Sequence, residues 1–330
     1  MAHVYVSNAD SGDITVLRMD AAGVLSLQGQ QRLGGNLMPM ALHPTGKMLY
    51  VARRTDPMAL ISLAIDSVSG DLHPRAEASL PASMAYVSTD RSGRFLFAAS
   101  YPQHKLTVSP IAEDGTVGAV VQVVDTGPNA HAVAPTPSNR HVLATSLGGG
   151  SLLVFGFDAA SGQLSPAGHW QARSGAGPRH FRFDPRGRFV YLLNELDGSL
   201  DVLAWDQAHA RLSHVQTVDT LPPGFAGKPW AADLQLTPDG RHLYSSERTS
   251  STLAHFAVDA VTGRLTAAGH TQVEAQPRGF AIDPSGRHLL VAGQLSHHLS
   301  RLLIDPHTAS LTLAQRIAVG QGPNWVEILP

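Results

Sequence analysis

Short apolar segments recur along the whole chain and are separated by polar turns. Many of them alternate apolar and polar residues, as in SLDVLAWD at 199–206, which is the pattern of a half-buried β-strand. Almost no stretch shows the 3.6-residue period of an amphipathic helix. The hydrophobic pattern therefore predicts an all-β protein built from many short strands.

One phrase, an apolar segment joined to a tight turn, recurs six times: HPTGKMLYVA, DRSGRFLFAA, TPSNRHVLAT, DPRGRFVYLL, TPDGRHLYSS and DPSGRHLLVA. Its central small residue is Gly46, Gly93, Asn139, Gly187, Gly240 or Gly286, at intervals of 47, 46, 48, 53 and 46 residues. Proline pre-sets φ and glycine accepts positive φ, so these positions favour turns. A fixed period of this size, with four short strands per unit, is typical of β-propeller blades.

The two ends of the chain complement each other. The segments VYVS, DITVLRMD and VLSLQGQ near the N-terminus match the second, third and fourth strands of a blade, and GPNWVEILP at 322–330 matches the first strand GPRHFRFDP at 177–185. The sequence therefore predicts a seven-bladed β-propeller with four antiparallel strands per blade, closed by three N-terminal strands and one C-terminal strand. Residues 1–330 are expected to form a single domain, since 330 residues divided by seven gives about 47, the observed period.

Composition narrows the classes of partner. The formal charge of −2 favours neither a nucleic acid nor an acidic membrane surface as a partner. No segment reaches the apolar length of a membrane-spanning helix, and the N-terminus lacks the basic and apolar regions of a signal peptide, so a cytoplasmic location is expected. The absence of cysteine excludes disulfides, thiolate metal sites and cysteine nucleophiles. A monomer is the default expectation for a closed propeller.

The repeat also indicates which face carries chemistry. The Gly-Arg turns all join first to second strands at one face, whereas the entries to the first strands and the loops after the second strands gather at the other, around the mouth of the central channel. That second face collects His131, Arg179, Glu195 and Arg248, joined by Arg278, Arg54, His180 and Asn194. Convergent polar groups in a concavity are the usual mark of an active site, and arginine suits phosphate or carboxylate. The expected ligand is a small anion.

Structural roles compete with these functional ones. Arg179 and Arg278 follow proline at matching repeat positions and could brace neighbouring blades, His131 could be a hydrogen-bonded strand residue, and Glu195 could close a loop. His297 and His298 resemble a metal pair, but adjacent strand residues point to opposite faces, which favours a solvated loop. Trp230 and Trp325, at two entries to the channel, are each expected to pack between blades. Asp233 is expected to cap a turn or to contact an arginine.

The chain resembles the bacterial propeller-type 6-phosphogluconolactonases, members of a lactonase family of seven-bladed propellers related to fungal carboxymuconate-lactonizing enzymes. The resemblance covers essentially the whole chain, and its most specific stretches are GPRHFRFDP, YLLNELDGSLDV, WAADLQLTPDGRHLY, QPRGFAIDPSGRHLLVAGQLSHH and AVGQGPNWV. Matching by motif, the family's proposed acting residues fall on His131 in NAHAVAP, Arg179 in GPRH, Glu195 in LNEL and Arg248 in SSERTSS.

The resemblance implies hydrolysis of 6-phospho-D-glucono-1,5-lactone to 6-phosphogluconate in the oxidative pentose phosphate pathway. His131 or Glu195 would take a proton from water, Arg179 or Arg248 would stabilise the oxyanion, and the remaining arginines would hold the phosphate. No cofactor or metal is needed for this chemistry, and an arginine-rich mouth would repel a cation. Relatives often read Asn-Arg-Gly where this chain has Glu247-Arg248-Thr249, so the extra carboxylate could draw Arg248 away from a ligand.

Two other functions fit the same residues. The arginines could bind the carboxylates of another anionic lactone, in a lactonase or lactonizing enzyme. The propeller could also be a non-catalytic binding module, since propellers host many unrelated functions.

Overall fold

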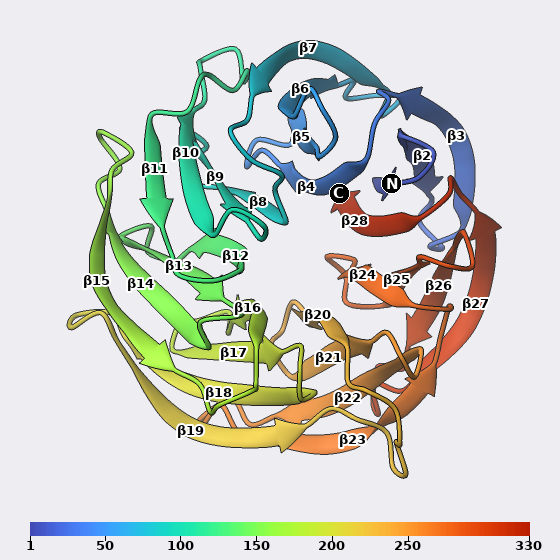
Figure 1. Ribbon diagram of the computed structural model, residues 1–330. Coiled ribbons are helices and arrows are strands. Elements are labelled where there is room, and N and C mark those ends of the chain that lie inside the picture. The colour runs from blue at the N-terminus through green and yellow to red at the C-terminus, as the bar shows by residue number, and fades with distance from the viewer.

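A computed structural model describes residues 1–330 and contains 28 strands and no helix. The strands form seven four-stranded antiparallel sheets arranged around a common axis (Figure 1). The innermost strands are β4 (Leu37–Leu42), β8 (Tyr86–Thr89), β12 (Ala130–Pro135), β16 (Pro178–Phe183), β20 (Ala231–Leu236), β24 (Pro277–Ile282) and β28 (Pro323–Leu329). The predicted seven-bladed propeller is confirmed.

The other three strands of each blade follow outward in chain order. The second strands are β5 (Met48–Arg53), β9 (Phe95–Ser100), β13 (His141–Ser146), β17 (Phe189–Asn194), β21 (His242–Glu247), β25 (His288–Gly293) and β1 (Ala2–Asn8). The third strands are β6 (Ala59–Ile65), β10 (Lys105–Pro110), β14 (Ser151–Phe157), β18 (Ser199–Asp206), β22 (Thr252–Val258), β26 (His298–Ile304) and β2 (Asp13–Met19). The outer strands are β7 (Leu72–Ser79), β11 (Gln122–Asp125), β15 (Leu164–Gln171), β19 (Arg211–Asp219), β23 (Leu265–Gln272), β27 (Leu311–Ala318) and β3 (Leu25–Arg32).

The ring closes through a sheet made from both ends of the chain. Strand β28 pairs antiparallel with β1, and the sheet order is β28-β1-β2-β3, as the sequence predicts. The two termini lie beside each other in this blade (Figure 1). This pairing covers the inner edge of β1, so the seventh sheet has the same four strands as the other six.

The turn phrase works through backbone conformation. All six central residues have positive φ, including Asn139 at 59° where the other repeats have glycine. Asparagine is among the few other residues that tolerate this region. The Asn139 side chain also bridges to the preceding blade, donating to Asp90 Oδ2 at 2.9 Å and accepting from the Arg91 amide at 2.9 Å. Asn139, which departs from the glycine consensus, therefore adds a contact between two blades.

The core lies between the blades. Rings and aliphatic side chains of neighbouring sheets pack face to face, as where Phe97 of β9 meets Phe157 of β14 with ring centroids 5.1 Å apart. The outer strands bury alternate residues or fewer, and their remaining side chains face solvent. Burial is thus concentrated on the inner three strands of each blade.

Four buried tyrosines link one blade to the next. Each lies on a second strand and donates its hydroxyl to a carbonyl in the turn between the third and fourth strands of the following blade: Tyr5 to Gly70, Tyr50 to Gly115, Tyr191 to Gly263 and Tyr244 to Ala309. A hydroxyl buried without a partner costs free energy, so each tyrosine specifies both the spacing and the register of two blades.

Tyr191→Phe should therefore lower the free energy of unfolding by about 1–2 kcal/mol, because it removes one buried hydrogen bond and leaves the Gly263 carbonyl without its donor. Chemical denaturation measures the change. Tyr101→Phe is the matched control, since the Tyr101 hydroxyl makes no hydrogen bond within the protein. Equal stability of the two variants would contradict an inter-blade role.

Candidate active site

A bulge at the start of several innermost strands places the candidate residues at the channel. In β16 the pairing register shifts between Pro178 and His180, and in β24 it shifts between Pro277 and Gly279. A regular strand would send Arg179 and His180 to opposite faces. The bulge instead brings their side chains into contact, with Arg179 Nη1 3.1 Å from His180 Nε2.

One carboxylate holds two arginines from different blades. Arg179 Nε donates to Glu195 Oε2 at 2.6 Å, and Arg248 Nη2 donates to the same oxygen at 2.9 Å. Both arginine side chains are 2% exposed, and Glu195 is 12% exposed. Arg248 also stacks on the Trp230 ring, with its guanidinium carbon 3.9 Å from the ring centroid. The loops after β17 and β21 are thereby joined to the start of β16.

Each of these arginines keeps one terminal nitrogen free. Arg179 Nη1 donates to the Ala232 carbonyl as well as to His180, so Nη2 has no protein partner. Arg248 Nε donates to the Trp230 carbonyl at 3.0 Å and Nη2 also reaches the Ala231 carbonyl at 3.3 Å, so Nη1 has none. Two anchored guanidinium groups therefore present free donors beside one carboxylate.

Glu247 does not draw Arg248 away. Its carboxylate is buried and accepts the Trp230 amide at 2.7 Å through Oε1 and the Ser250 amide at 2.5 Å through Oε2. The expectation of a competing carboxylate is wrong, because Glu247 caps backbone donors of its own blade while Arg248 pairs with Glu195.

Arg278 and Arg54 add positive charge without a carboxylate partner. Arg278 makes no hydrogen bond within the protein, and Arg54 donates to Ser83 Oγ at 2.9 Å and contacts Met38 Sδ. Burial, followed by the charges of Arg179 and Arg54, lowers the pKa of Arg278 to about 9. Arg179, Arg248 and Arg278 all act on the carboxylate of Glu195, and Arg54 adds a fourth guanidinium group next to Arg278, so positive charge dominates this cluster. The site is therefore suited to an anion.

The two acid–base candidates, Glu195 and His131, differ in charge state at neutral pH. Burial opposes ionisation of Glu195, but Arg179 and Arg248 outweigh it, so the pKa of Glu195 lies below its ordinary value. Burial, reinforced by Arg179, lowers the pKa of His131 well below its ordinary value. At neutral pH Glu195 is ionised and His131 is neutral. His131 Nδ1 has no hydrogen-bond partner, and the Tyr101 ring lies edge-on at 5.8 Å.

His180 and Asn194 are already committed to protein partners. His180 uses Nδ1 toward Asp233 Oδ1 at 2.9 Å and Nε2 toward Arg179. Asn194 is fully buried and donates to Ser199 Oγ at 2.8 Å and Asp201 Oδ2 at 2.7 Å. Asn8 occupies the equivalent place in the seventh blade, where it donates to Asp13 and Thr15. The amide nitrogen of Asn194 thus follows a pattern shared between blades, while its Oδ1 is buried and has no hydrogen-bond partner.

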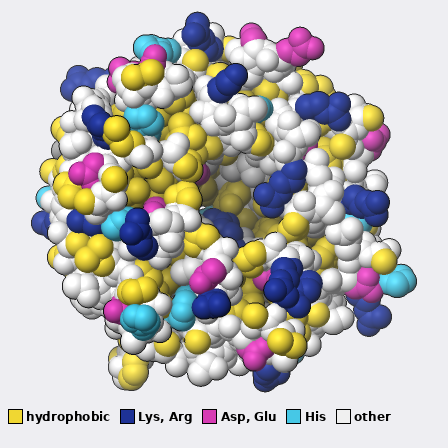
Figure 2. Space-filling view, turned by 180° about the vertical axis from the view of Figure 1, so that it is seen from behind, with side chains coloured by type: hydrophobic (Ala, Val, Ile, Leu, Met, Phe, Trp, Pro, Cys, Tyr) yellow, Lys and Arg dark blue, Asp and Glu magenta, His cyan; other side chains and the backbone are white.

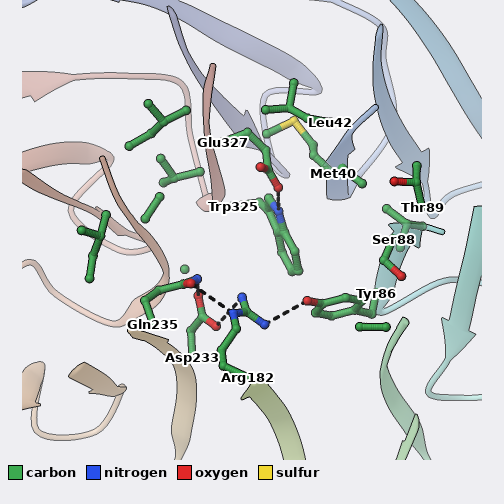
Figure 3. A pocket seen from close by; sticks show the side chains of 18 of the residues that line it. Met40, Leu42, Tyr86, Ser88, Thr89, Arg182, Asp233, Gln235, Trp325 and Glu327 are labelled. Atoms are coloured by element: carbon green, nitrogen blue, oxygen red, sulfur yellow. Dashed lines mark hydrogen bonds and ion pairs between the residues drawn. The ribbon is translucent and has the colours of Figure 1, made fainter. Parts of the chain in front are cut away.

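A cavity of about 650 Å³ lies in the other half of the channel, toward the Gly-Arg turns. Figure 3 shows its polar wall, where Arg182 reaches across to the Tyr86 hydroxyl at 3.1 Å and to Gln235 Oε1 at 3.1 Å. The space exists because four of the seven innermost strands carry a small residue at the position that Arg182 occupies in β16: Ala41, Ser88, Ala134 and Ala281. This cavity is not among the sequence-based predictions, although the polar residues at that repeat position in the other three strands, Arg182, Gln235 and Glu327, could have indicated it.

An aromatic layer separates the two halves of the channel. His180, Tyr86 and Trp325 come from three non-adjacent blades and meet with ring centroids 5.1–6.0 Å apart. The cavity is lined by Tyr86 and Trp325 but by none of His131, Arg179 or Glu195. Trp325, expected to pack between blades, packs across the channel instead, because its position in β28 corresponds to that of His180 in β16.

The mouth and the cavity thus differ in electrostatics. Figure 2, seen from behind the view of Figure 1, shows one face of the molecule hollowed at its centre, with hydrophobic side chains inside the hollow and lysine or arginine side chains near it. In the cavity, Arg182 lies 3.7 Å from Asp233, and burial raises the pKa of Glu327 to about 7. No group of three His, Asp or Glu side chains is placed to hold a metal ion, and no element is a helix able to cross a membrane.

These features define the class of protein, a seven-bladed β-propeller whose channel mouth carries an arginine-rich polar site. The family model described as "Lactonase, 7-bladed beta-propeller" matches residues 3–328, and the chain belongs to this family. It is 43% identical over 330 residues to a 6-phosphogluconolactonase of Pectobacterium carotovorum, covering 99% of this chain and 98% of that protein. It is 41% identical over 329 residues to a 6-phosphogluconolactonase of Xenorhabdus nematophila, with the same coverage.

A solved structure also matches along the whole chain. The periplasmic gluconolactonase of Pseudomonas aeruginosa superposes with a TM-score of 0.92 and 30% sequence identity, covering 100% of this chain and 99% of that one. The resemblance found in the sequence is confirmed at the level of the family.

The pKa of Glu327 yields a test of the cavity. Its pKa is raised from 4.5 to about 7 by burial, with Asp233 adding to the shift and Arg182 opposing it, so the folded state binds more protons between those pH values than the unfolded chain does. The stability contributed by this group is present below pH 4.5 and is lost as the pH rises through 7.

Glu327→Gln removes the titration and keeps an oxygen to accept the Trp325 Nε1 proton. We expect the variant to melt at a higher temperature than the wild type at pH 8 and at about the same temperature at pH 4, below both pKa values, measured by calorimetry. The same difference in melting temperature at both pH values would contradict the raised pKa.

Proposed function

We propose that this protein hydrolyses 6-phospho-D-glucono-1,5-lactone to 6-phosphogluconate, the lactonase step of the oxidative pentose phosphate pathway. The observation that carries the proposal is the cluster of four arginines around Glu195, with neutral His131 beside them. The full-length relatives named 6-phosphogluconolactonase support the substrate. An anionic phosphosugar would neutralise the excess charge of this cluster.

His131 serves as the general base in this proposal. Water attacks the lactone carbonyl carbon while His131 takes its proton, and the tetrahedral oxyanion forms. The bond between the carbonyl carbon and the ring oxygen then breaks, and the protonated His131 returns the proton to that oxygen. Burial, together with the charges of the arginines, holds the pKa of His131 low in the free protein. A bound phosphate offsets their charge and raises the basicity of His131 when substrate is present.

Glu195 is better suited to hold arginines than to take a proton. Its pKa is depressed, and Oε2 already accepts hydrogen bonds from Arg179 and Arg248. The free Nη2 of Arg179 and Nη1 of Arg248 are the donors for the oxyanion. Arg278 and Arg54, which lack a carboxylate partner, bind the phosphate.

The likeness to the Pseudomonas aeruginosa gluconolactonase suggests a second candidate substrate, the unphosphorylated gluconolactone. The two differ in whether a dianionic group must be bound, and Arg278 has no other partner to explain its place. We therefore favour the phosphorylated lactone. A monomer in the cytoplasm, with no nucleic-acid or membrane partner, remains a prediction.

Arg278→Ala should lower kcat/KM for the phosphorylated lactone about 10- to 100-fold, the value of one charge-assisted contact of about 1.5–3 kcal/mol. Turnover of unphosphorylated gluconolactone should change less than about threefold, since it lacks the group that Arg278 binds. Steady-state assays with both substrates measure the effect. Arg287→Ala, which removes an exposed arginine from a Gly-Arg turn, is the control. An equal loss for both substrates would argue against phosphate recognition by Arg278.

His131→Ala should lower kcat for the phosphorylated lactone by about 10²-fold or more, the usual contribution of a general base, and leave the melting temperature close to that of the wild type. Glu195→Gln should lower both, because two buried arginines lose the charge that holds them. Kinetics and calorimetry on the same preparations separate the two patterns. Full activity of His131→Ala would exclude His131 as the base.

A further inference from the structure

Arg179 is also held by a hydrogen-bonded relay of two residues, His180 and Asp233, which meets a guanidinium nitrogen other than the one that contacts Glu195. Arg179 Nη1 contacts His180 Nε2 at 3.1 Å, and His180 Nδ1 lies 2.9 Å from Asp233 Oδ1. All three residues are buried, and their side chains are 2% (Arg179), 2% (His180) and 8% (Asp233) exposed. The relay crosses from β16 to β20 and ends at the wall of the turn-side cavity.

The donors and acceptors of this relay fix one tautomer of His180. A guanidinium nitrogen can only donate, so His180 Nε2 must be the acceptor and the ring proton must lie on Nδ1. Burial, then the charge of Arg179, lowers the pKa of His180 well below its ordinary value, so the ring is neutral. The Nδ1 proton is directed to Asp233 Oδ1.

Asp233 is surrounded by donors only. The Leu234 amide donates to Oδ1 at 2.9 Å, and Gln235 Nε2 and the Phe280 amide donate to Oδ2 at 3.3 and 3.4 Å. Its carboxylate is therefore a fixed acceptor for His180. Tyr86 and Trp325 pack edge-on against the His180 ring and restrict its rotation.

We propose that Asp233 and His180 are positioning residues for catalysis: Asp233 fixes the Nδ1-protonated tautomer of His180, and His180 in that form holds the Arg179 guanidinium beside Glu195. The proposal rests on the lactonase function proposed above, since Arg179 affects turnover only at such a site. His180 is thereby assigned to Arg179 and not to direct contact with substrate.

The test combines a spectroscopic and a kinetic measurement on the full chain. Protein labelled with ¹⁵N-histidine reports the tautomer of each ring by NMR, and the His180 signals are assigned by their loss in His180→Gln. The wild type should show protonated Nδ1 and unprotonated Nε2 at position 180. A protonated Nε2 in the wild type would overturn the proposal without any variant.

Asp233→Leu removes the acceptor at nearly constant volume. We expect it to lose the fixed Nδ1-protonated signal and to lower kcat about 10- to 100-fold, less than or near the loss of a whole oxyanion donor, with KM changed less than about threefold. Asp233→Asn can keep an oxygen toward His180, so it should retain the tautomer and most of kcat. Asp184→Leu is the matched control: Asp184 directly follows β16, at the end of that strand away from His180, and its buried carboxylate caps backbone amides. This variant should lower stability without changing the tautomer or kcat.

The outcomes distinguish a failure of the positioning role from a failure of the proposed lactonase function. If the wild type does not hydrolyse the lactone, the proposed function fails, and the tautomer of His180 still reports on the network. If the wild type is active and Asp233→Leu keeps both kcat and the Nδ1-protonated signal, the positioning role alone is overturned. If Asp233→Leu does not fold, a loss of the tautomer or of more than about tenfold in kcat in Asp233→Asn would contradict the role given to its remaining oxygen.

Discussion

The pairing of β28 with β1 is the constraint on which the rest of the molecule depends. It joins residues more than 300 positions apart and completes the seventh sheet with the same four strands as the others. Only a closed ring fixes the distances between innermost strands that are not neighbours in the sequence. The contacts that matter at the axis, such as Trp325 of β28 with Tyr86 of β8, exist because the ring is closed.

Within that ring, the channel mouth is organised by charge imbalance. Glu195 neutralises only part of the charge of the arginines around it. Burial depresses the pKa of His131 and of Arg278, and the remaining positive charge adds to both shifts. This arrangement costs stability in the empty protein, since like charges are buried close together. An anionic ligand relieves the repulsion between the arginines, and this relief contributes to the free energy of ligand binding.

The strand order, the closing sheet and the face of the site were all predictable from the repeat, because turn residues and strand direction follow local rules. The pairing of Arg179 and Arg248 on one oxygen of Glu195 was not, since it depends on the bulge at Pro178 and on a cation–aromatic contact with Trp230. The roles of His180 and Asn194 were also out of reach. Both are polar residues near the mouth, and only their hydrogen-bond partners show that they face the protein.

The aromatic layer of Tyr86, His180 and Trp325 makes the molecule two-sided. The arginine cluster lies on the mouth side of this layer, and the cavity lies on the side of the Gly-Arg turns. A compound selected for its fit to the cavity of about 650 Å³ would occupy the chamber behind the site and would not compete with an anion at the mouth. If the proposed function holds, inhibitor design guided by the size of this cavity would address the compartment away from the arginine cluster, whereas small multivalent anions would address the cluster itself.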